Sequence, residues 1–102
     1  MTRRTAGCIE RAEARHKVAR LSCAVPRRTA LEADPQVAAA RQERMRHVQV
    51  VDLTSRLCNR RQCFPVIGGV LVYKDVHHFT LGFSKSLGPP LAHEVDQAMR
   101  AW

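Results

Sequence analysis

The chain has 102 residues, enough for one domain or part of one, and its formal net charge is +8. Hydrophobic residues make up 45% of it but aromatic residues only 5%, so a core must be built mainly from Leu, Val and Ala. The longest mostly apolar run is far shorter than the ~20 residues of a membrane-spanning helix, and no apolar segment follows the arginine-rich opening. The sequence therefore predicts neither a membrane span nor a signal peptide within it.

The positive charge is concentrated in the first half of the chain. Residues 1–46 hold eleven Lys/Arg and five acidic residues, whereas residues 47–102 hold six and four. A basic segment can attract nucleic acid or anionic lipid. Here the arginines follow a helical pattern, glutamates stand among them, and no aromatic residues separate them. We therefore expect a solvated helix face, with an anionic membrane surface favoured over nucleic acid as a partner.

The first seven residues carry no structural signal, and we expect 1–7 to be disordered. Apolar residues at helical spacing then predict a helix over 9–21. A continuous helix would hold the Cα atoms of Cys8 and Cys23 roughly 22 Å apart, whereas a disulfide needs about 4.4–6.8 Å. Either the chain doubles back between these cysteines or they do not pair.

Pro26 ends that segment, and a polar linker over 27–33 leads to a second helix. The helix is expected to begin at Asp34-Pro35, an N-cap residue followed by a proline at the first helical position, and to run to about residue 46. Residues 47–52 alternate and are rich in β-branched side chains, which predicts a strand. A helix leading into a strand indicates an α/β unit, and a short helical turn is expected over 53–57.

Cys58 and Cys63 enclose a short polar loop, which suits a disulfide. Free thiols are one alternative, and a metal site that adds His77 and His78 is another. The metal alternative is disfavoured because adjacent histidines point apart and a CxxC pair is missing. We expect no metal and no cofactor.

Residues 66–73 predict a hairpin, because Gly68-Gly69 between two apolar runs tolerates positive φ. The polar loop that follows holds Asp75 and His78. At this spacing the carboxylate can accept a hydrogen bond from one ring nitrogen and leave the other free to act as a base. From the spacing alone, a hydrogen bond that merely stabilises the loop is the favoured interpretation.

The last part of the chain predicts two helices. Thr80 is a suitable N-cap for the first. Gly88-Pro89-Pro90 should kink or break the helix before an amphipathic final helix over 91–102.

The order of these features resembles a known family. The run consists of VVDLTSRLC, a second cysteine, VIGGVLVYKDVHHFT and FSKSLGPPLA. It is similar to the C-terminal part of the SGNH-hydrolase-like domain fused to bacterial membrane acyltransferases of the acyltransferase 3 family. The similarity is strongest over 50–92 and extends more weakly back to Cys8 through CIERA, LSCAVPRRTAL and DPQVAAA.

The resemblance implies an incomplete α/β domain over 8–102. This would be a fragment of the flavodoxin-like three-layer SGNH fold, with one or two parallel strands, a β-hairpin and flanking helices. It also implies that Cys58 pairs with Cys63 and Cys8 with Cys23, on the extracytoplasmic side of the membrane where disulfides persist. A chain that doubles back would then replace the single helix over 9–21.

In this family the Asp-x-x-His motif supplies two members of a Ser-Asp-His triad. His78 would therefore be the general base and Asp75 the residue that orients it. The family's serine lies upstream in a Gly-Asp-Ser block, and the chain contains neither that block nor Gly-x-Asn-Asp.

The resemblance thus implies a truncated part of an O-acyltransferase or esterase of cell-envelope carbohydrate, inactive alone. Its partners would be an upstream SGNH half, a transmembrane acyltransferase domain and a carbohydrate acceptor. The alternative is a small basic protein that binds nucleic acid or an anionic membrane surface.

Overall fold

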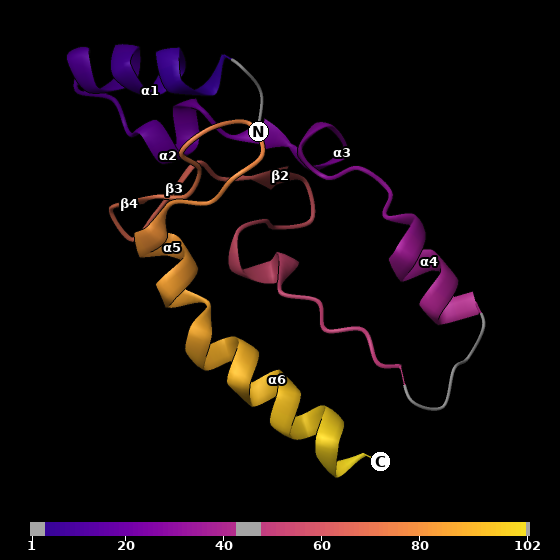
Figure 1. The fold of residues 1–102 in the computed structure, drawn as a ribbon. Coiled ribbons are helices and arrows are strands. Elements are labelled where there is room, and N and C mark those ends of the chain that lie inside the picture. The colour runs from indigo at the N-terminus through magenta and orange to yellow at the C-terminus, as the bar shows by residue number, and fades with distance from the viewer. Residues whose placement is uncertain (1–3, 43–47, 102) are drawn as a thin grey trace.

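The computed structural model describes residues 4–42 and 48–101 (Figure 1). The elements follow in the order α1 (Thr5–Ala14), α2 (Ala19–Ser22), β1 (Val25–Pro26), α3 (Arg27–Ala30), α4 (Pro35–Gln42), the 3-10 turn η1 (Thr54–Arg56), β2 (Gln62–Cys63), β3 (Val66–Ile67), β4 (Val70–Leu71), α5 (Leu81–Ser86) and α6 (Gly88–Arg100). Figure 1 shows α1, α2 and the strands gathered at one end, from which α4 and α6 extend as separate arms. No helix in these two ranges is long and apolar enough to span a membrane.

The N-terminal part forms two helices that fold back on each other. The chain reverses after α1, where His16 adopts a φ of 55°, and α2 returns towards the start of α1. The Cα atoms of Cys8 and Cys23 lie 5.8 Å apart and their sulfur atoms are bonded. The prediction of a continuous helix over 9–21 is therefore wrong, since such a helix could not bring these two cysteines together. The doubled-back chain implied by the family is observed instead.

Part of the segment expected to be disordered is helical. Residues 5–7 form the first turn of α1, and the N–H of Cys8 donates to the carbonyl of Arg4 at 3.0 Å. The disulfide at Cys8 and the burial of Thr5 fix this turn against the rest of the chain. Residues 1–3 lie outside the described residues.

The polar linker expected over 27–33 contains α3, and it is tied to the cysteine loop. β1 pairs antiparallel with β2, so that Val25 lies opposite Cys63. Directly after it, the N–H of Arg27 donates to the carbonyl of Arg61 at 2.8 Å. A two-residue strand is too short to produce a recognisable periodicity, which is why the sequence did not indicate it.

The second helix begins where predicted. Oδ1 of Asp34 accepts the N–H groups of Gln36 and Val37 at 2.9 and 3.4 Å. The described part of α4 ends at Gln42, and the expected extension to residue 46 falls on residues outside the description.

The strand predicted over 47–52 is not formed in its described part, since residues 48–52 have no regular secondary structure. Both sheets in the described ranges are two-stranded and antiparallel, so the expected parallel strands are not observed. A strand requires a neighbour to complete its backbone hydrogen bonds. No described strand pairs with 48–52. The fold is thus a mixture of helices and small antiparallel sheets.

The hairpin and two helices after it are observed as predicted, but the break between the helices lies at Leu87, and Gly88-Pro89-Pro90 belong to the first turn of α6. Val66 pairs with Leu71, and the turn glycines have φ values of 57° and 74°. Oγ1 of Thr80 accepts the N–H of Phe83 at 3.2 Å and so caps α5, and α6 begins at Gly88 with proline in its first turn. A buried cluster beneath the hairpin forms the core, and it consists of Leu57, Cys58, Cys63, Val72 and Phe83.

Candidate active site

The loop 74–78 is closed at its base by contacts between the residues on either side of it. Tyr73 and Phe79 form an isolated antiparallel bridge, and their ring centroids are 5.1 Å apart. Inside this bridge the N–H of Lys74 donates to the carbonyl of His78 at 3.0 Å. The ring of Phe79 also lies edge-on to buried Phe83, at 5.1 Å. The loop is therefore anchored to the core although its tip is exposed.

Asp75 orders the tip of the loop through its own side chain. Its Oδ1 accepts the backbone N–H of His77 at 2.8 Å and that of His78 at 2.9 Å. Aspartate favours such turns because its short carboxylate reaches the backbone two and three residues further on. The carboxylate is thereby held in one position.

The hydrogen bond predicted between Asp75 and His78 is present. Nδ1 of His78 lies 2.9 Å from Oδ1 and 3.0 Å from Oδ2 of the carboxylate. The His78 side chain is 67% exposed and that of Asp75 is 52% exposed. The edge of the imidazole ring opposite Asp75 is therefore open to another group.

Electrostatics fix the roles of the two ring nitrogens. The N–H of His77 and then the hydrogen bond with the His78 ring hold the pKa of Asp75 below its ordinary value of 3.8. The carboxylate is ionised at neutral pH and can only accept hydrogen bonds. In the neutral imidazole Nδ1 therefore carries the proton, and Nε2 presents its lone pair to the solvent.

All four cysteines are in disulfides. Cys58 and Cys63 are bonded, with Cα atoms 3.9 Å apart, and Cys8 is bonded to Cys23. Of the three alternatives for Cys58 and Cys63, the structure therefore shows the disulfide, and not free thiols or a metal site with His77 and His78. Among the described residues, no group of three or more His, Cys, Asp and Glu side chains could hold a metal ion.

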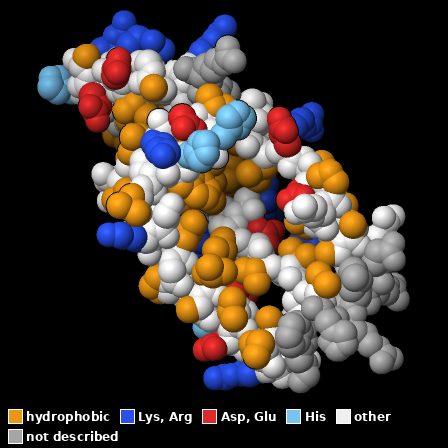
Figure 2. Space-filling model, viewed as in Figure 1, with side chains coloured by type: hydrophobic (Ala, Val, Ile, Leu, Met, Phe, Trp, Pro, Cys, Tyr) orange, Lys and Arg blue, Asp and Glu red, His pale blue; other side chains and the backbone are white. Residues whose placement is uncertain are grey.

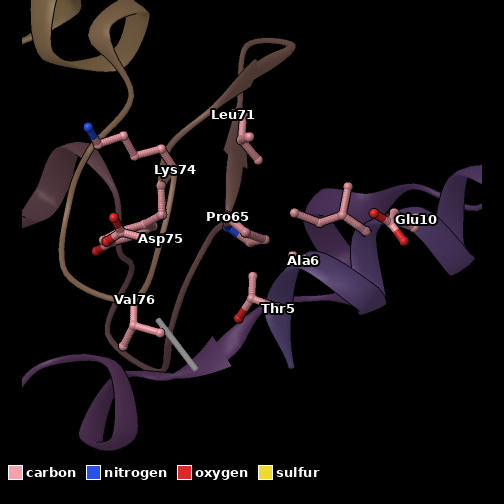
Figure 3. Close-up of a pocket in the computed structure, with 10 residues that line it drawn as sticks. Thr5, Ala6, Glu10, Pro65, Leu71, Lys74, Asp75 and Val76 are labelled. Atoms are coloured by element: carbon pink, nitrogen blue, oxygen red, sulfur yellow. The ribbon is translucent and has the colours of Figure 1, made fainter. Parts of the chain in front are cut away.

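A pocket of about 390 Å³ lies beside the pair, between the loop and α1 (Figure 3). Ala6, Ile9 and Leu71 contribute apolar wall to it, and Lys74 and Asp75 stand at its edge. Figure 3 shows the carboxylate of Asp75 and the ammonium of Lys74 directed away from α1. The pocket therefore adjoins the pair and is not centred on it. Sequence reasoning missed the contribution of α1, because residues 5–7 were expected to be disordered.

A second hollow lies between α4 and α6. It has a volume of about 540 Å³, and Val37, Val50, Leu53 and Leu91 are among its lining residues. Figure 2 shows apolar side chains gathered over a hollowed face of the molecule. The apolar stripe of α6 is also exposed, with Val95 at 45% and Met99 at 60%. Apolar side chains are therefore accessible both in this hollow and along α6.

A known protein family matches most of the chain. The family described as the SGNH domain (fused to AT3 domains) matches residues 2–93. The match includes the loop with Asp75 and His78, both disulfides and the hairpin. No curated protein and no solved structure matches the chain.

Proposed function

The chain belongs to the family of SGNH domains fused to AT3 domains, and from this premise we propose that Asp75 and His78 are the Asp-His part of a Ser-Asp-His triad. The family is of the acyltransferase and esterase type. The reaction proposed is transfer or hydrolysis of an O-acyl group on a cell-envelope carbohydrate, outside the cytoplasm. Two disulfides support an oxidising setting, because such bonds persist there.

The observation that carries the proposal is the hydrogen bond of Nδ1 of His78 to the Asp75 carboxylate, at 2.9 Å. With Nδ1 protonated, Nε2 accepts the proton of a serine hydroxyl as its oxygen attacks the acyl carbonyl. The imidazolium then donates that proton to the leaving oxygen. Asp75 stabilises the positive ring and holds it in the productive orientation.

The serine comes from outside these residues. The chain has no Gly-Asp-Ser block, and Ser86 donates its hydroxyl to the carbonyl of Phe83 at 2.6 Å within α5. We therefore assign the nucleophile and the oxyanion donors to an SGNH segment outside these residues. The 102-residue chain alone should not turn over an acyl ester.

The surface proposed for that segment is the apolar hollow between α4 and α6. Residues 50–52 line one side of it, and no described strand pairs with the segment 48–52. An added strand would satisfy their backbone N–H and carbonyl groups and would cover Val50 and Val51. The occupant we propose is a strand of the SGNH segment that carries the serine.

The experiment combines the purified, oxidised chain with an SGNH segment of a family member that contains the Gly-Asp-Ser block. An activated acetyl ester serves as the substrate. We expect no turnover by the chain alone and turnover by the mixture, which His78→Ala removes. Val50→Asp should prevent it by blocking docking, whereas Gln49→Asp adds the same charge on a residue that does not line the hollow.

Two results would contradict the proposal. Turnover by the chain alone that His78→Ala abolishes would show that the serine is not external. Turnover by the mixture that survives His78→Ala would show that His78 is not the base.

A further inference from the structure

Four arginines from two distant parts of the sequence line one groove. Arg27 and Arg28 belong to α3, and Arg60 and Arg61 belong to the loop closed by the Cys58–Cys63 disulfide. The groove has a volume of about 610 Å³, and its other lining residues are Pro26, Thr29 and Leu31. We call it the arginine groove. None of the described acidic residues lines it.

The backbone holds the two arginine pairs together. The N–H of Arg27 donates to the carbonyl of Arg61 at 2.8 Å, and Nη1 of Arg27 donates to the carbonyl of Asn59 at 2.9 Å. Arg28, Arg60 and Arg61 are exposed. Arg27 thus anchors the groove, and the other three guanidinium groups are accessible to a ligand. Like charges gathered in this way repel one another unless an anion lies between them.

The chemistry of the groove fits a phosphate ester. Guanidinium groups bind phosphate oxygens through paired N–H donors, and the interaction is stronger than with an ammonium group. The neighbouring pocket contains the carboxylate of Asp52, together with Arg27 and Arg60. That carboxylate lies 4.0 Å from Arg41 and also interacts electrostatically with Arg27, whereas Arg28 and Arg61 lie outside that pocket.

We propose that the arginine groove binds the phosphate groups of anionic phospholipids and so holds the chain against a membrane surface. The family is fused to AT3 domains, which supports a membrane-linked setting. Single-stranded nucleic acid is disfavoured because its binding sites use aromatic stacking platforms, and no aromatic residue of the described part of the chain lines the groove. The proposal is independent of the Asp75–His78 pair, so either can fail without the other.

The test measures co-sedimentation of the oxidised chain with vesicles of phosphatidylcholine, alone or with about one third phosphatidylglycerol. We expect binding only to the anionic vesicles. The double variant Arg60→Ala/Arg61→Ala should weaken it roughly twenty-five-fold, at about five-fold for each basic residue near the surface. Arg11→Ala/Arg15→Ala removes the same charge from the C-terminal end of α1, which lies on the opposite side of the molecule from α3 (Figure 1), and it should weaken binding only a few-fold.

A third variant and competition by soluble phosphate compounds separate lipid binding from a folding defect and from other ligands. Arg28→Ala leaves the disulfide loop unchanged and should weaken binding about five-fold, so a folding defect in the double variant would not explain the loss. Equal losses in both double variants, or binding that does not depend on phosphatidylglycerol, would overturn the proposal. Complete displacement by millimolar glycerol phosphate would also overturn it and indicate a soluble phosphate ester. Tighter binding to an oligonucleotide, lost in Arg60→Ala/Arg61→Ala, would overturn it in favour of nucleic acid.

Discussion

Asp75 holds His78 at two points. Its Oδ1 accepts the backbone N–H of His78 at 2.9 Å, and the ring Nδ1 lies 2.9 Å from the same oxygen. One carboxylate therefore fixes both the path of the chain and the tautomer of the imidazole. This double role allows the structural and the catalytic contributions of Asp75 to be separated by mutation.

Asp75→Asn should preserve the loop but not the tautomer. The oxygen of the asparagine amide can still accept the N–H groups of His77 and His78. The NH₂ group of the same amide is a donor, so it would favour the imidazole tautomer in which Nδ1 has no proton and Nε2 carries it. We expect turnover of the complemented protein to fall by about 10⁴-fold. The backbone amide chemical shifts of His77 and His78 should change little. Unchanged turnover would show that the pair only stabilises the loop.

The two adjacent histidines provide a matched comparison. His78→Ala removes the proposed base, and we expect turnover of the complemented protein to fall by several orders of magnitude. His77→Ala keeps the backbone N–H that Asp75 accepts at 2.8 Å, so its turnover should stay within a few-fold of the parent. Steady-state kinetics on the activated ester measure both. Equal losses would contradict the assignment of His78.

Acid should loosen the loop only below the ordinary range for aspartate. The pKa of Asp75 in the folded chain is below 3.8, chiefly because of the N–H of His77, so its ionised form is stabilised by folding. That stabilisation is fully present above the pKa that Asp75 has in the unfolded chain. It is lost as the pH falls through the pKa of Asp75 in the folded chain. The backbone amide shifts of His77 and His78 should therefore titrate with a midpoint below 3.8. A midpoint at or above that value would contradict the backbone bonds.

The sequence predicted the local features that depend on few residues. The caps at Asp34 and Thr80, the glycine turn and the Asp75–His78 contact are each specified within four residues. Features that depend on distant partners were missed. The reversal at His16, the pairing of β1 with β2 and the wall that α1 adds to the pocket require contacts across the chain. The strand predicted over 47–52 has the expected composition, but a strand also requires a neighbour.

Loss of the Cys8–Cys23 disulfide should disturb the pocket as well as the stability. The bond closes a loop of 15 residues, for which chain entropy predicts a contribution of about 3 kcal/mol. Because α1 forms one wall of the pocket beside Asp75, its release should open that pocket. Urea unfolding of Cys8→Ser/Cys23→Ser against the oxidised parent measures the free energy of unfolding. A change well below 1 kcal/mol would indicate that α1 is held by other contacts.

A comparison of Gly69 in the hairpin turn with Gly88 in α6 tests whether the turn requires positive φ. Gly69 has a φ of 74°, and a Cβ added there would meet no atom of the described residues within 4 Å, so any penalty comes from the backbone alone. We expect Gly69→Ala to lower the free energy of unfolding by about 1–2 kcal/mol. Gly88→Ala is the control, because that position also has space for a Cβ, lies in α6 and has no positive φ. Helix propensity predicts a gain of up to about 1 kcal/mol there. Equal losses at both positions would mean that the turn geometry is not what Gly69 provides.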